Sequence, residues 1–146
     1  MDTLEREHHD YFSVSFRIIN NNLDPLKLTE LLGIKPDRAH KNGDPNTGIA
    51  KSGKIIHYAP FRTGLWSIDS NLDKYCRLHE HFIHLLKRLE PHKDKLVELY
   101  KDGFDLDFFC GYFFTNANQP GFALTNEILV KMGALGIKLN ICLYPL

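Results

Sequence analysis

The sequence contains little cysteine, no long apolar run and no net charge, and each absence excludes a class of protein. Its three cysteines, Cys76, Cys110 and Cys142, form no Cys-x-x-Cys pair. This argues against a disulfide framework or a zinc knuckle and indicates a reducing compartment. The longest uninterrupted bulky stretch, at 108–114, is far shorter than the roughly 20 residues that span a bilayer. Because the first residues also lack an apolar signal-peptide core, we predict a cytoplasmic protein without a membrane segment.

The charge balance and the missing motifs restrict the chemistry further. Lys plus Arg and Asp plus Glu each number 18, so the formal net charge is zero, which disfavours general nucleic-acid binding. The chain also lacks the phosphate-binding loop, the dinucleotide fingerprint and the Gly-x-Ser-x-Gly elbow of known enzyme classes. We therefore expect no cofactor and lean against an enzyme.

Hydrophobic periodicity predicts an α+β fold. Residues 11–19 alternate between apolar and polar side chains, which is typical of a strand with one buried face. Asp24 and Pro25 then provide the start of a helix, and Gly33 provides its end. Residues 42–54 are rich in Gly, Asn and Ser and indicate a mobile loop or the tip of a long hairpin. The remaining pattern predicts short strands at 55–61 and 64–70, helices at 73–90 and after Pro91, a long strand at 104–115, a helix at 125–135 and a strand at 137–144.

This order of elements favours one domain with helices packed on one face of a mostly antiparallel sheet. The specific prediction is a ferredoxin-like β-α-β-β-α-β kernel that is extended by a further α-β unit. The domain covers residues 11–146, and residues 1–10 are expected to form a flexible N-terminal segment.

Histidines in the long helix raise the question of a metal site. His81 and His84 have the three-residue spacing that places two ligands on one helix face. However, Arg77 and Arg88 lie on the same flank, and their charges oppose a bound cation. We interpret the histidines as part of a polar flank beside the apolar stripe and predict no metal ligand.

Polar residues on alternate strand positions predict a second group, on the sheet face opposite the helices. Asp105 and Asp107 share a face of the long strand, a spacing that suits a metal or a shared proton. The alternative is a structural role, in which Arg17 or Lys138 pairs with these carboxylates.

The stretch Ile34–Asp44 is the third candidate. Arg38, His40 and Lys41 offer hydrogen-bond donors, and Gly43 allows close backbone approach, so an anion is one candidate ligand. The alternative is a structural role: Pro36, Gly43 and Asp44 are residues typical of turns, and Arg38 ties the loop to a helix end or to Asp69. Aromatic residues form 12% of the chain; most belong in a core, and the group around Phe109, Phe113 and Phe114 is a candidate partner surface.

Several motifs resemble a known family. The run Gly-Ile-x-Pro-x-Arg-Ala-His-x-x-Gly-Asp at 33–44 and the Gly-x-Trp at 64–66, together with the long helix and the final strand, resemble the bacterial domain-of-unknown-function family 4279. The resemblance covers roughly residues 11–145 and implies a bacterial, single-domain, cytosolic protein without supplying an activity. Between the two motifs, residues 45–58 resemble an insertion.

Two functional hypotheses follow from the sequence. The first is a non-catalytic protein-binding module, of an immunity type that neutralises a toxin or of a regulatory type. The second is a small anionic-ligand-binding protein or enzyme that uses the loop of Arg38 and His40. The candidate ligand- or partner-binding residues are Arg17, Arg38, His40, Asp44 and Trp66. A single pocket joining Arg38, His40 and Trp66 favours the ligand, whereas a flat, exposed aromatic or charged face favours a protein partner.

Overall fold

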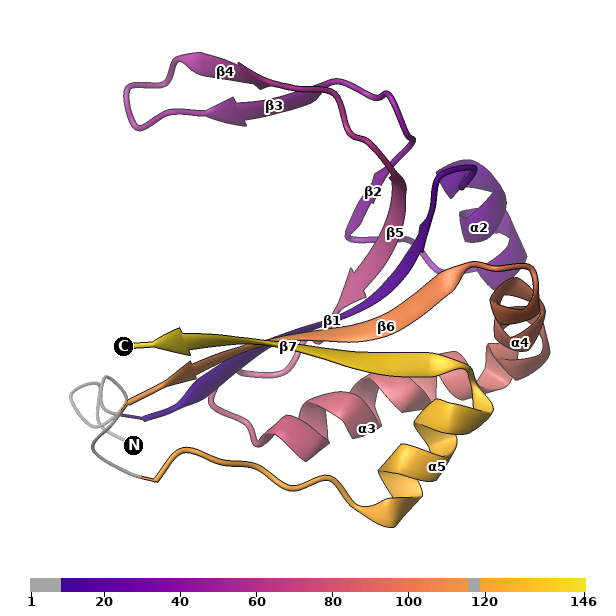
Figure 1. Cartoon of the computed structure of the whole chain (residues 1–146), viewed down its shortest axis with the longest axis vertical. Helices are drawn as coiled ribbons and strands as arrows, with labels where there is room; N and C mark the ends of the chain where they lie inside the picture. The colour runs from indigo at the N-terminus through magenta and orange to yellow at the C-terminus, as the bar shows by residue number, and fades with distance from the viewer. Residues whose placement is uncertain (1–8, 116–118) are drawn as a thin grey trace.

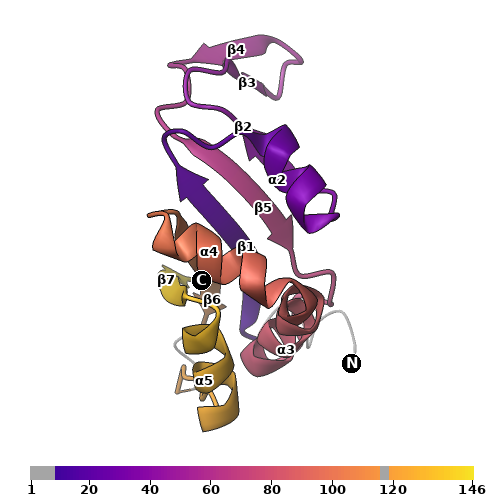
Figure 2. The ribbon, with the colours of Figure 1, turned by 90° about the vertical axis from the view of Figure 1, so that its right-hand side faces the viewer.

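A five-stranded sheet with helices along one face forms the body of the protein (Figures 1 and 2). The computed structural model describes residues 9–115 and 119–146. Its elements are β1 (Tyr11–Asn20), α2 (Pro25–Leu32), β2 (Arg38–His40), β3 (Asn46–Ile49), β4 (Ile55–Tyr58), β5 (Gly64–Asp69), α3 (Leu78–Leu89), η1 (Glu90–His92), α4 (Lys93–Lys101), β6 (Asp105–Phe114), α5 (Asn126–Ala134) and β7 (Ile137–Pro145). Of the N-terminal segment predicted at residues 1–10, residues 1–8 lie outside the part of the chain that the structure describes.

The strand order in the sheet is β2-β5-β1-β6-β7, and every pair is antiparallel except β6 with β7. The predicted α+β class, with a mostly antiparallel sheet and helices packed alongside it, is confirmed. The ferredoxin-like kernel stays a prediction. None of the described helices is both long enough and apolar enough to cross a membrane.

The core lies between the sheet and the helices. The alternation predicted for β1 and β6 is confirmed, because one set of side chains from each strand is buried under the helices. Phe16 and Phe108 pack edge to face at 6.1 Å between ring centroids, and Phe82 of α3 stacks on Phe108 at 5.0 Å. The helix predicted after Asp24 is also confirmed: the Asp24 side chain accepts a hydrogen bond from the Leu26 backbone, and Gly33 ends the helix at φ +64°.

The long helix begins five residues later than predicted. The expected start was residue 73, but α3 begins at Leu78. The backbone of Tyr75 instead donates to the Asp73 side chain, which forms a turn, and Glu80 accepts from the Arg77 backbone at 2.7 Å. A carboxylate that accepts a hydrogen bond from the backbone N–H just before a helix stabilises the first turn, so Glu80 places the beginning of α3 after Arg77.

The middle of the chain differs from the prediction. The strand expected at 55–61 does not enter the main sheet; β4 pairs with β3 in a separate two-stranded hairpin. The strand that pairs with β5 is β2, inside the stretch predicted to be a turn-rich loop. The hairpin, residues 46–58, is called the arm below. Its neck is held by two backbone hydrogen bonds, Gly43 to Phe61 at 2.7 Å and Phe61 to Asp44 at 3.1 Å.

Candidate functional site

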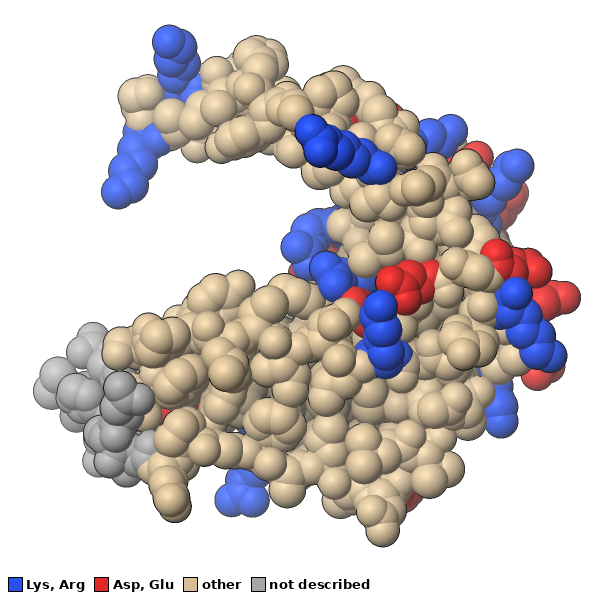
Figure 3. Space-filling view, viewed as in Figure 1, with Lys and Arg blue, Asp and Glu red and all other residues tan. Residues whose placement is uncertain are grey.

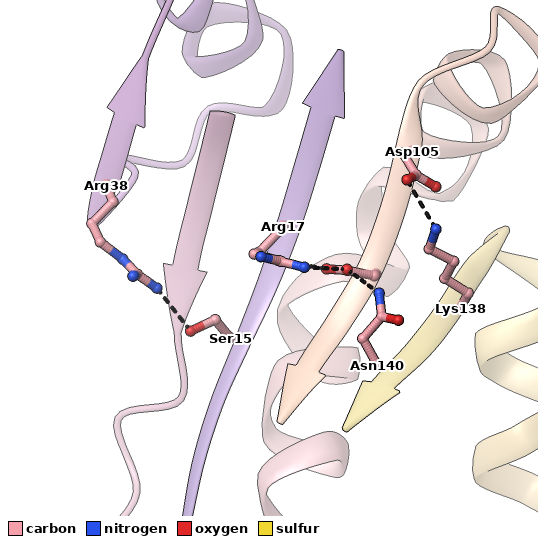
Figure 4. A network of polar contacts seen from close by, with 7 residues as sticks. Ser15, Arg17, Arg38, Asp105, Lys138 and Asn140 are labelled. Carbon is pink, nitrogen blue, oxygen red and sulfur yellow. Dashed lines mark hydrogen bonds and ion pairs between the residues drawn. The ribbon is translucent and has the colours of Figure 1, made fainter. Parts of the chain in front are cut away.

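The sheet face opposite the helices, called the open face below, carries a network of ion pairs (Figure 4). Arg17 of β1 stands opposite Asp107 of β6 and donates to both carboxylate oxygens, from Nε at 2.9 Å and from Nη2 at 2.6 Å. Asn140 of β7 donates to the same carboxylate at 2.6 Å. The hydrogen bond to Asp107 raises the pKa of Arg17 more than burial lowers it. Arg17 therefore has the structural role that the sequence analysis gave as the alternative to a ligand site: its charge is already neutralised by the buried carboxylate of Asp107.

A second ion pair lies two strands away on the same face. Arg38 of β2 donates from Nη2 to Ser15 Oγ at 3.1 Å and to Asp69 Oδ1 at 3.2 Å, and Ser15 donates to Asp69 at 2.6 Å. This pair is more exposed, because the side chains of Arg38 and Asp69 keep 57% and 44% of their surface. The predicted tie between Arg38 and Asp69 is confirmed, and Arg38 still has donors that face solvent.

Three of the predicted site residues line one open pocket of about 580 Å³. Arg38, His40 and Asp44 lie there, with His40 stacked on Phe61 at 3.6 Å between ring centroids. Asp44 accepts a hydrogen bond from the Lys41 backbone and thereby closes a turn. Because Asp37 and Asp44 both line this pocket, their carboxylates oppose a bound anion.

Trp66 does not join them. It pairs with Ile18 and Ala39, which places it on the helix-covered face, where it is fully buried and donates from Nε1 to Thr29 Oγ1 at 3.1 Å. Arg17 and Arg38 both pair with Ser67, the next residue, on the opposite face. The single pocket that would favour a small ligand is therefore not formed.

A row of stacked rings crosses the far end of the open face. Phe113 of β6 lies between Tyr11 of β1, at 4.5 Å, and Tyr144 of β7, at 4.7 Å, with each ring pair stacked. Lys74 stands over Tyr11 at 4.2 Å, and the Arg17 guanidinium lies 4.3 Å from the centre of the Phe109 ring. These aromatic side chains are only partly covered, and they give the open face an apolar end beside its charged middle.

The arm carries large apolar side chains that no core covers. Ile49, Ile55, Ile56 and Tyr58 keep 80%, 60%, 37% and 55% of their surface exposed. Cations accompany them, since Lys51 and Lys54 lie in the turn between β3 and β4 and residues 45–68 contain no Asp or Glu. An isolated two-stranded hairpin is marginally stable in water, and exposed apolar clusters mark interaction sites.

The arm projects over the open face, so the molecule has the outline of a C (Figure 1). The space-filling view shows a broad hollow between the two, with Lys and Arg side chains at the free end of the arm and at the base of the hollow (Figure 3). This hollow, bounded by the arm and the open face, is called the clamp below. Arg38 of the open face lines two pockets, one together with Ser15 and Asp69 and the other together with His40 and Asp44. The exposed aromatic and charged side chains expected of a protein-binding face are therefore present, but they line a hollow rather than the flat face that was predicted.

The sequence interpretation missed one buried polar pair. His81 was expected on a polar flank of α3, but it is 1% exposed, and its Nδ1 lies 2.6 Å from Ser70 Oγ at the end of β5. His81 lies three residues after Leu78 and four before Leu85, both buried, so the helical spacing places it on the face of α3 that packs against the sheet. Its Nε2 has no hydrogen-bond partner of good geometry among the described residues. Burial lowers the pKa of His81, and the Cys76 carbonyl raises it by less. No group of three or more metal-ligating side chains occurs in residues 9–115 and 119–146.

Lowering the pH is expected to destabilise the fold through His81. The unfolded chain takes up a proton near pH 6.5, while the folded chain resists it because the pKa is lowered. The contribution of His81 is therefore complete above the ordinary pKa and is lost as the pH falls below it, by at most about 1.4 kcal/mol per pH unit. Urea unfolding of the wild type and of His81→Asn, at neutral pH and at about one unit below the ordinary value, measures this. Equal pH dependence in the two proteins would contradict it.

Comparison with known proteins agrees with the motifs at 33–44 and 64–66. The model of one family, described as Domain of unknown function (DUF4279), matches residues 8–146. The chain belongs to this family. No curated protein and no solved structure matches the chain. The DUF4279 match spans the main sheet, the helices and the arm alike, so the clamp lies within the matched region.

Proposed function

We propose that this chain is a non-catalytic bacterial protein-binding module of the cytoplasm, and that a protein partner binds in the clamp. The partner is of the kind that an immunity-type or regulatory protein binds: a toxin that it neutralises or a protein whose activity it controls. The observation that carries the proposal is the arm, which holds three isoleucines and a tyrosine in water without a core beneath them.

The energetics of the arm support a protein rather than a small ligand. Fully burying one isoleucine side chain is worth about 1.5–3 kcal/mol relative to leaving it exposed. A partner that covers the four exposed apolar side chains of the arm therefore gains a substantial part of its binding free energy from them. A small ligand in the pocket of Arg38, His40 and Asp44 leaves these side chains uncovered.

Nucleic acid also fits less well. A sequence-independent nucleic-acid site needs unpaired cations along a groove. On the open face, Arg17, Arg38 and Lys138 are each paired with a carboxylate, at 2.6, 3.2 and 2.9 Å. Isoleucines offer no contact to a phosphate, whereas they pack well in the centre of a protein interface.

Photocrosslinking from the arm tests this proposal. We expect a photoreactive amino acid at position 55 to crosslink a distinct second protein in cells. The same amino acid at position 26, where Leu26 of α2 is 79% exposed away from the arm, is the matched control and should not capture that protein. Mass spectrometry of the products separates a foreign partner from a second copy of this chain. Identical products from both positions, or none other than self-crosslinks, would overturn the proposal.

A further inference from the structure

The arm has apolar side chains on both of its faces. In an antiparallel pair, directly opposite residues lie on the same face. Ile49 pairs with Ile55, which places both on one face. Gly48 pairs with Ile56, and a side chain at Gly48 would meet the Tyr58 ring, which places Ile56 and Tyr58 together on the other face. A ribbon that covers a core has one polar face, so this pattern requires two apolar neighbours, one above and one below.

A single partner inside the clamp contacts one face of the arm and leaves the other in water. Two copies of the chain solve this if each places its arm in the clamp of the other. The layers then run from one sheet to the partner's arm, to the first arm, and to the partner's sheet. Each arm is covered on one face by an open face and on the other by the second arm. We propose that the chain forms a two-fold dimer by this reciprocal exchange of arms.

The charges on the two surfaces agree with this arrangement. Lys51 and Lys54 are at the free end of the arm. Asp69 and Asp105 are on the open face, and each is already paired with a cation, Arg38 or Lys138, but their side chains keep 44% and 53% of their surface exposed, so each carboxylate can share a second cation. If the two-fold axis runs across the arms, they are antiparallel, and the cations of one free end approach the base of the partner's clamp. Arg17, Arg38 and Lys138 of the open face are each paired with a carboxylate there and therefore repel these cations little. The formal net charge of zero adds no overall repulsion between copies.

The aromatic row supplies the apolar neighbour on the sheet side. Tyr11, Phe113 and Tyr144 are stacked side by side on the open face, and Tyr144 is 43% exposed. A specific interface buries roughly 1,200–2,000 Å² of surface in total. Reciprocal exchange buries surface on the arm and on the open face of both copies, so four surfaces contribute to this area. This proposal goes beyond the proposed function, because it names a second copy as the occupant of the clamp when no other protein is bound.

The test uses the full chain, purified, over a wide range of concentrations in sedimentation equilibrium. We expect the wild type to be a dimer, and Ile55→Lys and Ile56→Lys, one from each face of the arm, each to weaken dimerisation by roughly tenfold or more. Leu26→Lys is the control and should dimerise as the wild type does. Far-ultraviolet circular dichroism checks that the variants remain folded. A wild type that stays monomeric, or a dimer that both arm variants leave intact, would overturn the proposal.

A carbodiimide crosslink provides a second measurement that does not depend on a substitution. In dimers of mixed isotopic labelling, we expect crosslinks between copies from Lys51 or Lys54 to Asp69 or Asp105. Crosslinks confined to the free edge of β7 would instead assign the dimer to edge pairing and contradict arm exchange. The two proposals can fail separately. If the chain does not dimerise, capture of a foreign protein at position 55 still supports the proposed function. If the chain dimerises through its arms but captures no foreign protein, only the proposed function is contradicted.

Discussion

Replacing Arg17 with methionine is expected to lower the free energy of unfolding by about 3–5 kcal/mol. The Asp107 side chain is 3% exposed, and Arg17 supplies two of its hydrogen bonds. Methionine keeps much of the side-chain volume but leaves a buried carboxylate with Asn140 as its remaining side-chain donor among the described residues. Urea unfolding at neutral pH measures the change.

Lys138→Met is the matched control for this variant. Lys138 and Asp105 form an ion pair on the same face at 2.9 Å, but their side chains are 54% and 53% exposed. Exposed pairs contribute at most about 1 kcal/mol, so this variant should be nearly as stable as the wild type. Equal losses from the two substitutions would show that the Arg17–Asp107 pair behaves as a surface pair and that Arg17 is free to bind a partner.

Trp66→Ala is expected to lower the free energy of unfolding by about 3–5 kcal/mol because it leaves a cavity between β5 and the helices. The indole is fully buried and packs edge to face on Phe16 at 6.5 Å. Chemical denaturation measures the loss. Because Trp66 lies on the helix-covered face, the proposed arm-exchange dimer adds no contact that could compensate for it.

Trp66→Phe separates the ring from its polar atom. This variant keeps most of the apolar contact and removes the hydrogen bond from Nε1 to Thr29, so the loss should be smaller than for alanine. A Trp66→Ala variant that stays as stable as the wild type would mean that the tryptophan is a surface residue and would restore it as a candidate binding residue.

Local signals in the sequence predicted the first part of the fold well. The alternation from Tyr11 onward, the cap at Asp24 and the stop at Gly33 are each set by a few neighbouring residues, and the structure confirms all three. The start of α3 was wrong because the apolar spacing of Tyr75 fits a helix, while the turn at Asp73 and the carboxylate of Glu80 decide the outcome.

Nonlocal pairing explains why the middle of the chain was predicted less well. Both β2 and β4 are short, and neither has a strong apolar alternation. Which of them joins β5 depends on hydrogen bonds between strands that periodicity does not encode. The position of the arm over the open face depends on this choice, so the clamp could not be predicted from the sequence.

In the candidate site, too, features set by local alternation were predicted, whereas features set by strand pairing were not. The sequence placed Arg17 and Asp107 on one face because strand residues alternate, and the ion pair follows from that alternation. Trp66 was grouped with Arg38 because both belong to conspicuous motifs. A motif says nothing about which side of a sheet a residue faces, and the register of β2 with β5 pairs Arg38 with Ser67, the neighbour of Trp66, which puts Arg38 and Trp66 on opposite sides.

The neck at Gly43, Asp44 and Phe61 has a consequence for how this fold can diversify. Two backbone hydrogen bonds close the chain before the arm begins, so the main sheet does not depend on the length or composition of residues 46–58. Doubling the length of a flexible loop costs only about 0.6 kcal/mol. The arm, which we propose contacts the partner, can therefore change in length or sequence without new core residues.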